Sequence, residues 1–254
     1  MRSEAIEIRE CGTLAELAEC VQLQREVFAL PEVELSPVRH FVVTKNAGGF
    51  TLGAYDDGRL AGFVLSVPAF LRGERAFYSH MTGVRPEYQG SGIGARLKWA
   101  QRRRALELGV RYIKWTFEPV KARNAYFNLE KLGAIVCEYE VNFYGTDYGS
   151  AQAESPEPVG LQSDRLFAEW HLESEKVTNL AEGHTWHEAV MPVAEIEVTN
   201  DWTDLVESDP ASALELQLAI RSRFQAVFAD GLVARSFRRD PERPAYLFYS
   251  QPDV

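Results

Sequence analysis

The part of this sequence whose residue types point most directly to chemistry is a glycine-rich turn between an expected strand and an expected helix. It reads Gln89-Gly90-Ser91-Gly92-Ile93-Gly94 and runs on into Ala95-Arg96-Leu97-Lys98. Free backbone N–H groups at the start of a helix point outward and carry a partial positive charge. Glycines remove side chains, so an anion can come close to this backbone. The segment predicts a site for a phosphate or pyrophosphate group, and its plainer interpretation is a tight turn that opens a helix.

Two other kinds of phosphate-binding loop fit these residues less well. A Walker loop ends in Gly-Lys-Ser or Gly-Lys-Thr, which this turn lacks, and a dinucleotide-binding loop reads GxGxxG after the first strand of a parallel repeat. Here the spacing is GxGxG, and the turn follows an expected hairpin. The longer pattern, Val84-x-Pro86-Glu87-Tyr88-Gln89-x-x-Gly92-x-Gly94, instead resembles the acyl-CoA-binding motif of the GCN5-related N-acetyltransferase (GNAT) superfamily.

A second segment carries the same resemblance. Ala122 to Ala134 is similar to the following helix of that family, which typically ends in Lys-Leu-Gly, here Lys131-Leu132-Gly133. The resemblance covers about residues 1–145, and the whole chain resembles a bacterial branch of predicted acetyltransferases with a C-terminal extension. It implies an N-acyltransferase that moves an acyl group from acyl-CoA to the amine of a small molecule by direct attack. The expected co-substrate is acetyl-CoA, with a longer acyl group such as succinyl left open.

The resemblance also implies where the coenzyme binds. The backbone amides of Gln89 to Gly94 would hold the pyrophosphate, and the strand backbone near Met81 to Val84 would pair with the pantetheine arm. That arm would lie where this strand and the strand at 112–117 part, and no metal is expected. The expected coenzyme-binding residues are Thr82, Gly83, Val84, Gln89, Gly90, Ser91, Gly92, Ile93, Gly94, Asn124 and Asn128.

The downstream helix departs from the family pattern at two positions. The usual asparagine would stand at Ala122; Asn124 and Asn128, four residues apart on one helix face, could bond the pantetheine arm or cap a neighbouring group. The family often places a tyrosine four residues before the glycine to protonate the leaving thiolate, and here that residue is Leu129. Tyr126, one turn earlier, is the substitute acid, with side-chain packing as the plain alternative.

Two residues are candidates for the general base. His80 lies on the strand that enters the motif, where alternation places Tyr78, His80 and Thr82 on one face. In this family one face of that strand often looks onto the acceptor site, and histidine titrates near neutral pH. Glu118 follows the next strand and could take a proton from the amine directly or through water. The plain alternatives are a packed histidine and a solvated loop carboxylate.

The helix after the turn carries the densest basic run of the chain. A solvated helix face explains such a run, and contact with the remaining phosphate of the coenzyme is the functional alternative. The run consists of Arg96, Lys98, Arg102, Arg103 and Arg104.

Hydrophobic periodicity predicts the elements that must position these residues. In the first part it predicts strands at 5–9, 50–55, 60–70, 76–84, 112–117 and 135–144, and helices at 13–28, 37–43, 93–108 and 123–132. Thr13 and Glu16 stand at the capping-box positions of the first helix. The order predicts an α/β fold (an α+β mixed sheet covered by helices), which is a GNAT-like acyl-CoA-binding fold with a smaller C-terminal α/β extension.

The segment at 146–160, rich in Gly, Ser, Pro and Glu, predicts a linker. It would separate the acyl-CoA-binding domain at 1–145 from an acidic extension at 161–254. Residues 1–145 hold 19 Lys/Arg and 17 Asp/Glu, whereas the rest of the chain holds 8 and 20. The second part therefore carries the whole acidic excess, which favours either a cationic acceptor or a solvated surface. Its expected elements are strands at 165–172, 194–198, 232–237 and 245–249 and a helix at 210–228.

Composition narrows the class of protein. The 254 residues are 46% hydrophobic and 25% charged, as is typical of a globular chain, and the net charge of −10 disfavours a nucleic-acid partner. Cys11, Cys20 and Cys137 lack CxxC spacing and are expected as free thiols in a reducing compartment. No apolar run approaches the ~20 residues of a membrane span. We expect a cytoplasmic, soluble protein with no membrane partner, and a homo-oligomer is left open.

Two further hypotheses remain beside the enzyme. Leu129 in place of tyrosine keeps open a catalytically inactive scaffold that binds acyl-CoA and regulates a partner. His184 and His187, with Glu188, have the spacing of metal ligands on a helix. No third well-placed ligand accompanies the two histidines, so these residues are expected as surface residues.

Overall fold

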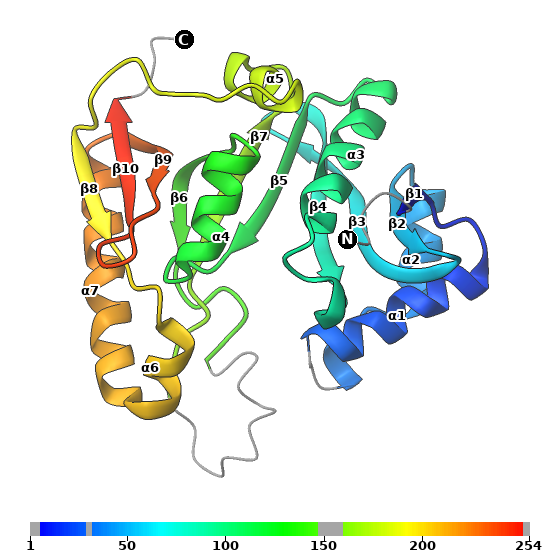
Figure 1. The fold of residues 1–254 in the computed structure, drawn as a ribbon, viewed down its shortest axis with the longest axis horizontal. Coiled ribbons are helices and arrows are strands. Elements are labelled where there is room, and N and C mark those ends of the chain that lie inside the picture. The colour runs from blue at the N-terminus through cyan, green and yellow to red at the C-terminus, as the bar shows by residue number, and fades with distance from the viewer. Residues whose placement is uncertain (1–5, 29–31, 147–159, 251–254) are drawn as a thin grey trace. The chain divides into compact units, whose positions relative to one another are not determined.

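The computed structural model describes residues 6–28, 32–146 and 160–250. The chain divides into two compact units, residues 1–114 and residues 115–254. The expected mixed α/β fold is confirmed, because each unit combines strands and helices (Figure 1). The division falls inside strand β5 (Tyr112–Phe117), not at the segment predicted from composition. Residues 147–159 lie outside the described residues, so the linker at 146–160 stays a prediction.

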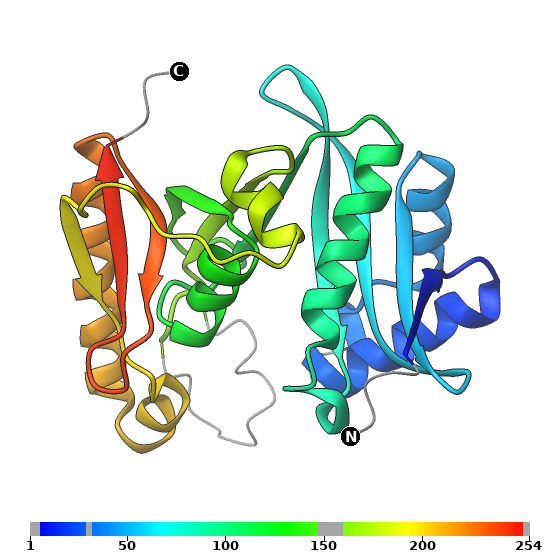
Figure 2. The same ribbon diagram turned by 45° about the horizontal axis from the view of Figure 1, so that its top comes forward.

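The first unit is a sheet with helices on both faces. Its strands are hydrogen-bonded in the order β1-β2-β3-β4-β5, antiparallel except for the parallel pair β4–β5. Helix α3 packs on one face of the sheet, and helices α1 and α2 pack on the other (Figure 2). The bounds are β1 (Glu7–Glu10), α1 (Leu14–Phe28), η1 (Glu32–Glu34), α2 (Val38–Asn46), β2 (Phe50–Asp56), β3 (Arg59–Leu71), β4 (Glu74–Val84), η2 (Pro86–Tyr88) and α3 (Ile93–Glu107).

Local chemistry explains where the first elements begin and turn. The capping box of α1 is confirmed: the amide of Thr13 donates to Glu16 Oε2 (2.9 Å), and the amide of Glu16 donates to Thr13 Oγ1 (3.2 Å). The β2–β3 hairpin turns at Asp57 and Gly58, both with positive φ (47° and 82°), as a tight two-residue turn requires. These elements match the sequence prediction to within a few residues.

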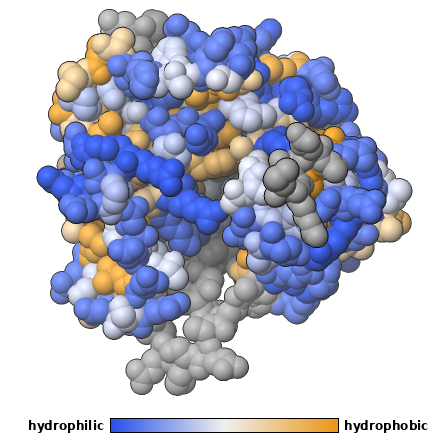
Figure 3. All heavy atoms as spheres, in the orientation of Figure 1, coloured by the Kyte–Doolittle hydropathy of each residue, from blue (hydrophilic) through white to orange (hydrophobic). Residues whose placement is uncertain are grey.

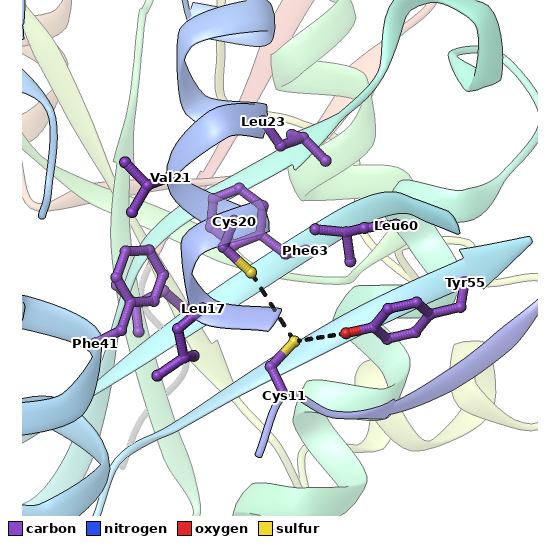
Figure 4. Packing of buried hydrophobic residues seen from close by; sticks show 10 residues of the cluster. Cys11, Leu17, Cys20, Val21, Leu23, Phe41, Tyr55, Leu60 and Phe63 are labelled. Atoms are coloured by element: carbon purple, nitrogen blue, oxygen red, sulfur yellow. Dashed lines mark hydrogen bonds between the residues drawn. The ribbon is translucent and has the colours of Figure 1, made fainter. Parts of the chain in front are cut away.

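A buried cluster joins α1 and α2 to the sheet (Figure 4). Cys20 and Phe41, one from each helix, are fully buried against Phe63 of β3. Cys11 Sγ lies 3.9 Å from Cys20 Sγ and 3.3 Å from the Tyr55 hydroxyl. The three cysteines of the chain are free thiols, as predicted.

The basic run of α3 is not a uniformly solvated face. Lys98 is buried, and its Nζ donates to Ser79 Oγ (3.0 Å). Arg96 donates to the carbonyl of Ile6 (2.6 Å). Arg104 pairs with the Glu10 carboxylate (3.5 Å). Part of the run therefore ties α3 to β4 and to the chain at β1, which charge counting alone does not reveal.

The second unit contains a five-stranded antiparallel sheet in the order β7-β6-β9-β10-β8. The long helix α7 packs on β6, β8 and β9. The bounds are α4 (Ala122–Tyr126), the π-helical turn η3 (Phe127–Lys131), β6 (Ile135–Glu140), β7 (Arg165–His171), α5 (Glu175–Ala181), β8 (Ala194–Glu197), α6 (Trp202–Ser208), α7 (Pro210–Ala229), β9 (Leu232–Arg238) and β10 (Ala245–Ser250).

Aromatic packing and one buried ion pair hold α7 on its sheet. Phe224 is fully buried, with its ring centroid 5.0 Å from that of Tyr246 and 5.6 Å from that of Phe248. Arg221 reaches both carboxylate oxygens of the buried Asp164, at 2.9 and 3.0 Å. The predicted strands and long helix are present, and the short helices α5 and α6 are additional to the prediction.

The surface shown in Figure 3 is mostly hydrophilic, with scattered apolar atoms. Among the helices of the described residues, none has the length and apolar character needed to cross a membrane.

Candidate functional site

The glycine-rich turn forms an open helix N-terminus at the end of β4. Gly92 precedes α3 with a φ of 87°, and the first helical hydrogen bond runs from the amide of Arg96 to the Gly92 carbonyl (3.1 Å). Within the described residues, the amides of Ile93, Gly94 and Ala95 have no hydrogen-bond acceptor and no side-chain cap. A Cβ on Gly92 would meet no atom within 4 Å. The turn thus presents three unsatisfied donors to open space, as an anion site requires.

Side chains of the turn fix its shape. The hydroxyl of Tyr88 donates to Asp56 Oδ2 (2.7 Å) at the end of β2, and the hydroxyl of Ser91 donates to the Tyr88 carbonyl (2.5 Å). The side-chain amide of Gln89 donates through Nε2 to the Val84 carbonyl (3.1 Å). These contacts involve only the side chains of the turn, so the backbone donors at the start of α3 stay available.

The edge of β4 beyond β5 is open over its second half. The ladder between β4 and β5 consists of Phe77–Ile113 and Tyr78–Lys114, although β4 runs on to Val84. The amide of Arg85 donates to Ala61, towards β3, so alternation turns the backbone of Thr82 and Val84 to the opposite edge. Within the described residues, the backbone N–H groups of Thr82 and Val84 on this edge have no backbone acceptor, and they lead towards the turn.

A β-bulge at His80 changes which side chains share a face. Leu65 pairs with Met81 and Ser66 pairs with Ser79, so His80 is the extra residue of β4. Met81 packs against the α1–α2 cluster, whereas Ser79 contacts Lys98 of α3. His80 and Met81 therefore point to the same face, and Thr82 turns to the other. The expected common face of Tyr78, His80 and Thr82 is wrong at Thr82, because the bulge interrupts the alternation.

His80 lies next to two polar side chains, Ser36 and His40. Its Nε2 lies 3.2 Å from Ser36 Oγ, and its ring centroid lies 5.2 Å from that of His40. Although His80 keeps an exposed surface, the protein around the ring displaces water and His40 adds repulsion, which lowers the pKa of His80 to about 4. The ring is therefore neutral at pH 7 and has one nitrogen able to accept a proton.

The sequence prediction missed Ser36 and His40. Ser36 stands 44 residues from His80 in the chain, and nothing in its neighbours marks it. The local signal is Pro37, the N-cap of α2, which places Ser36 directly before the start of that helix.

In the second unit the other candidate residues have protein partners of their own. Glu118 forms an ion pair with Lys121 (2.5 Å). The ring of Tyr126 has cations over it, with Lys131 Nζ 5.5 Å and Arg239 Cζ 5.1 Å from the centroid. Their proposed roles in proton transfer stay predictions.

The two asparagines differ in environment. Asn128 is buried and accepts a hydrogen bond from the indole N–H of Trp115 (3.2 Å), whereas Asn124 is half-buried. Asn124 belongs to α4, and Asn128 belongs to the wider π-helical turn η3, as does the fully buried Leu129. Such turns occur often at functional sites. Coenzyme binding by either asparagine stays a prediction.

Comparison with known proteins agrees with this architecture. Residues 16–134 match the model of the Acetyltransferase (GNAT) family. Among curated proteins, no significant sequence match to this chain was found.

Three solved structures share the fold at low sequence identity. A protein assigned as an acetyltransferase, from Acinetobacter baylyi ADP1, is 16% identical with a TM-score of 0.53, covering 67% of this chain and 93% of that one. An assigned GNAT acetyltransferase from Desulfovibrio desulfuricans is 14% identical with a TM-score of 0.52, covering 66% and 99%. The ribosomal-protein-S18-alanine N-acetyltransferase from Escherichia coli is 14% identical with a TM-score of 0.50, covering 73% and 98%.

The fold and the turn together define an α/β domain in which an uncapped helix N-terminus lies at the end of a strand that is paired with β5 over only part of its length. Residues 16–134 of the chain form a domain of the GNAT acetyltransferase family.

Proposed function

We propose that the protein is an acyl-CoA-dependent N-acyltransferase that transfers an acyl group, expected to be acetyl, to the amine of a small molecule. One observation carries the proposal: the unsatisfied amides of Ile93, Gly94 and Ala95 stand at the end of a strand whose outer edge is free. A ligand that joins a pyrophosphate to an extended chain of amides matches both features. The Escherichia coli neighbour, a ribosomal-protein-S18-alanine N-acetyltransferase, supports an amine as the acceptor class.

The residues present fit the coenzyme. The pyrophosphate would accept hydrogen bonds from the start of α3, where the backbone N–H groups carry partial positive charge. The pantetheine amides would pair with the backbone of Thr82 and Val84 along the open edge of β4. Gly83 has a different role, because its missing Cβ lets α1 pack closely: a Cβ there would lie 3.0 Å from Leu23 Cδ2.

We assign His80 as the general base. The neutral ring takes a proton from the acceptor amine as the nitrogen attacks the thioester carbonyl; the C–N bond forms, the C–S bond breaks and the thiolate is protonated. The bulge places His80 outside the regular ladder, on the face opposite α3. Glu118 and Tyr126 stay candidates as a second base and as the acid for the thiolate.

Thiol release from acetyl-CoA across a panel of small amines tests the proposal, together with calorimetric binding of acetyl-CoA alone. Thr82→Pro removes one outward N–H without touching the pairing towards β3, so it should weaken acetyl-CoA binding. Binding without thiol release from any amine would support the acyl-CoA-binding scaffold instead. No binding at all would contradict both functions.

We also place the protein in the cytoplasm. The buried free thiols Cys11 and Cys20, 3.9 Å apart, are typical of a reducing compartment. Cell fractionation, followed by detection of the protein in the cytoplasmic fraction, tests this proposal.

A further inference from the structure

Three polar side chains link the buried side of α1 to the bulge of β4. The amide of Gln24 forms two hydrogen bonds with the backbone of Ser36: its Oε1 accepts from the Ser36 amide (3.0 Å), and its Nε2 donates to the Ser36 carbonyl (3.1 Å). Ser36 Oγ in turn lies 3.2 Å from His80 Nε2. Gln24 is 1% exposed and Ser36 is 9% exposed, so both are held inside the protein.

The two hydrogen bonds from Gln24 hold the backbone of Ser36 more rigidly than the backbone of a surface loop residue is held. Hydrogen bonds to both the N–H and the C=O of one residue leave little freedom for its backbone, and burial makes the loss of either bond costly. The hydroxyl of Ser36 therefore meets the imidazole at a set position, and it has no other hydrogen-bond partner among the described residues.

The position of the hydroxyl decides which ring nitrogen of His80 can act. Nε2 faces Ser36, so Nδ1 is the nitrogen left for a substrate. In a neutral imidazole one nitrogen carries the proton and the other carries the lone pair. If His80 is the base of the proposed acyl transfer, its proton must stand on Nε2 and its lone pair on Nδ1.

We propose that Ser36 is a positioning residue that accepts the Nε2–H of His80 and thereby keeps the lone pair on Nδ1, with Gln24 holding Ser36 in place. This inference rests on the proposed function. It adds two residues that the sequence does not mark, and it specifies a tautomer. His40, whose ring lies in a T-shaped arrangement with that of His80, is the titratable neighbour that must also be followed.

The tautomer can be observed without any substrate. In ¹⁵N-labelled protein at pH 7, long-range ¹H–¹⁵N correlation should show His80 with Nε2 protonated and Nδ1 unprotonated; His80→Gln and His40→Gln assign the signals. Ser36→Ala should turn the ring into a mixture of tautomers, and Gln24→Ala should shift it in the same direction. Gln22→Ala is the matched control, because Gln22 lies exposed on the same helix and, among the described residues, its side chain forms a hydrogen bond only with Arg25.

Turnover gives the second readout. Ser36→Ala should lower kcat about tenfold while the acetyl-CoA Kd stays unchanged, since only part of the general-base contribution is lost. Ser36→Thr keeps the hydroxyl and should restore both tautomer and rate. An Nδ1–H tautomer in the wild type, or no change in tautomer in Ser36→Ala, overturns the inference even if acyl transfer is observed. A wild type with the expected tautomer that acylates no amine overturns the proposed function instead.

Discussion

A carboxylate placed on Gly92 tests the assignment of the helix N-terminus most directly. The residue has a φ of 87°, and a Cβ on it would meet no protein atom within 4 Å. The Cβ of Gly92→Asp would therefore clash with none of the described residues. It adds left-handed strain of about 1–2 kcal/mol to the folded state and a negative charge where the pyrophosphate would lie.

The electrostatic part can be worked out. Two unit charges about 5 Å apart repel with about 0.8 kcal/mol at the dielectric constant of water, so two phosphate charges give about 1.6 kcal/mol. At about 1.4 kcal/mol per factor of ten, the affinity for acetyl-CoA should fall about fifteenfold. A lower effective dielectric constant near the protein, about 20, enlarges the effect, so about fifteenfold is the minimum expected at low ionic strength.

Calorimetry of acetyl-CoA binding at two salt concentrations measures this loss. Gly92→Asn has nearly the same shape without the charge, so the ratio of the two affinities isolates the repulsion, which should shrink at high salt. Gly73→Asp is the matched control: its φ is 80°, its Cβ would also meet nothing within 4 Å, and it lies at the other end of β4, about 35 Å away. Equal affinities for Gly92→Asp and Gly92→Asn, or wild-type affinity in both, would refute the site.

Three further predictions concern stability. Thr13→Ala removes the side-chain cap on Glu16 and should cost about 1 kcal/mol in urea unfolding, whereas Thr13→Ser should cost little. Because the fold lowers the pKa of His80 to about 4 from 6.5, the stability from its neutral form is fully present above pH 6.5 and lost as the pH falls towards 4. His80→Gln should lose less stability than the wild type between pH 7 and 4.5, and parallel losses would contradict this. Arg221→Met leaves the buried Asp164 carboxylate without its cation and should cost about 3–5 kcal/mol; an unchanged melting temperature would show the pair to be dispensable.

The sequence predicts the elements of the first unit well because each is marked locally. Thr13 and Glu16 begin a helix by their own hydrogen bonds, and Asp57-Gly58 closes a hairpin by its own backbone preference. The glycine-rich turn is marked in the same way, since Gly92 supplies a positive φ before α3. Patterns formed by residues close together in the sequence can be recognised without knowledge of the tertiary structure.

Features that depend on distant residues are harder to predict. From the sequence, Lys98 is one of several basic residues on a helix. In the structure it is buried and donates a hydrogen bond to Ser79 of β4. The short helices α5 and α6 carry too few residues for a clear hydrophobic period. The second unit also begins before the region marked by composition, because its contacts include β5 and α4.

The bulge at His80 shows why face assignments fail where a strand departs from regular alternation. Regular alternation from Ser79 would place Met81 towards α3 and Thr82 towards α1. One extra residue reverses both, so Met81 and Gly83 fill the core under α1 and α2 while Val84 approaches α3. The same residue is left outside the ladder, where its ring meets Ser36. A single inserted residue thus lets Met81 fill the core and leaves His80 on the same face, and for this reason Thr82 does not share a face with His80.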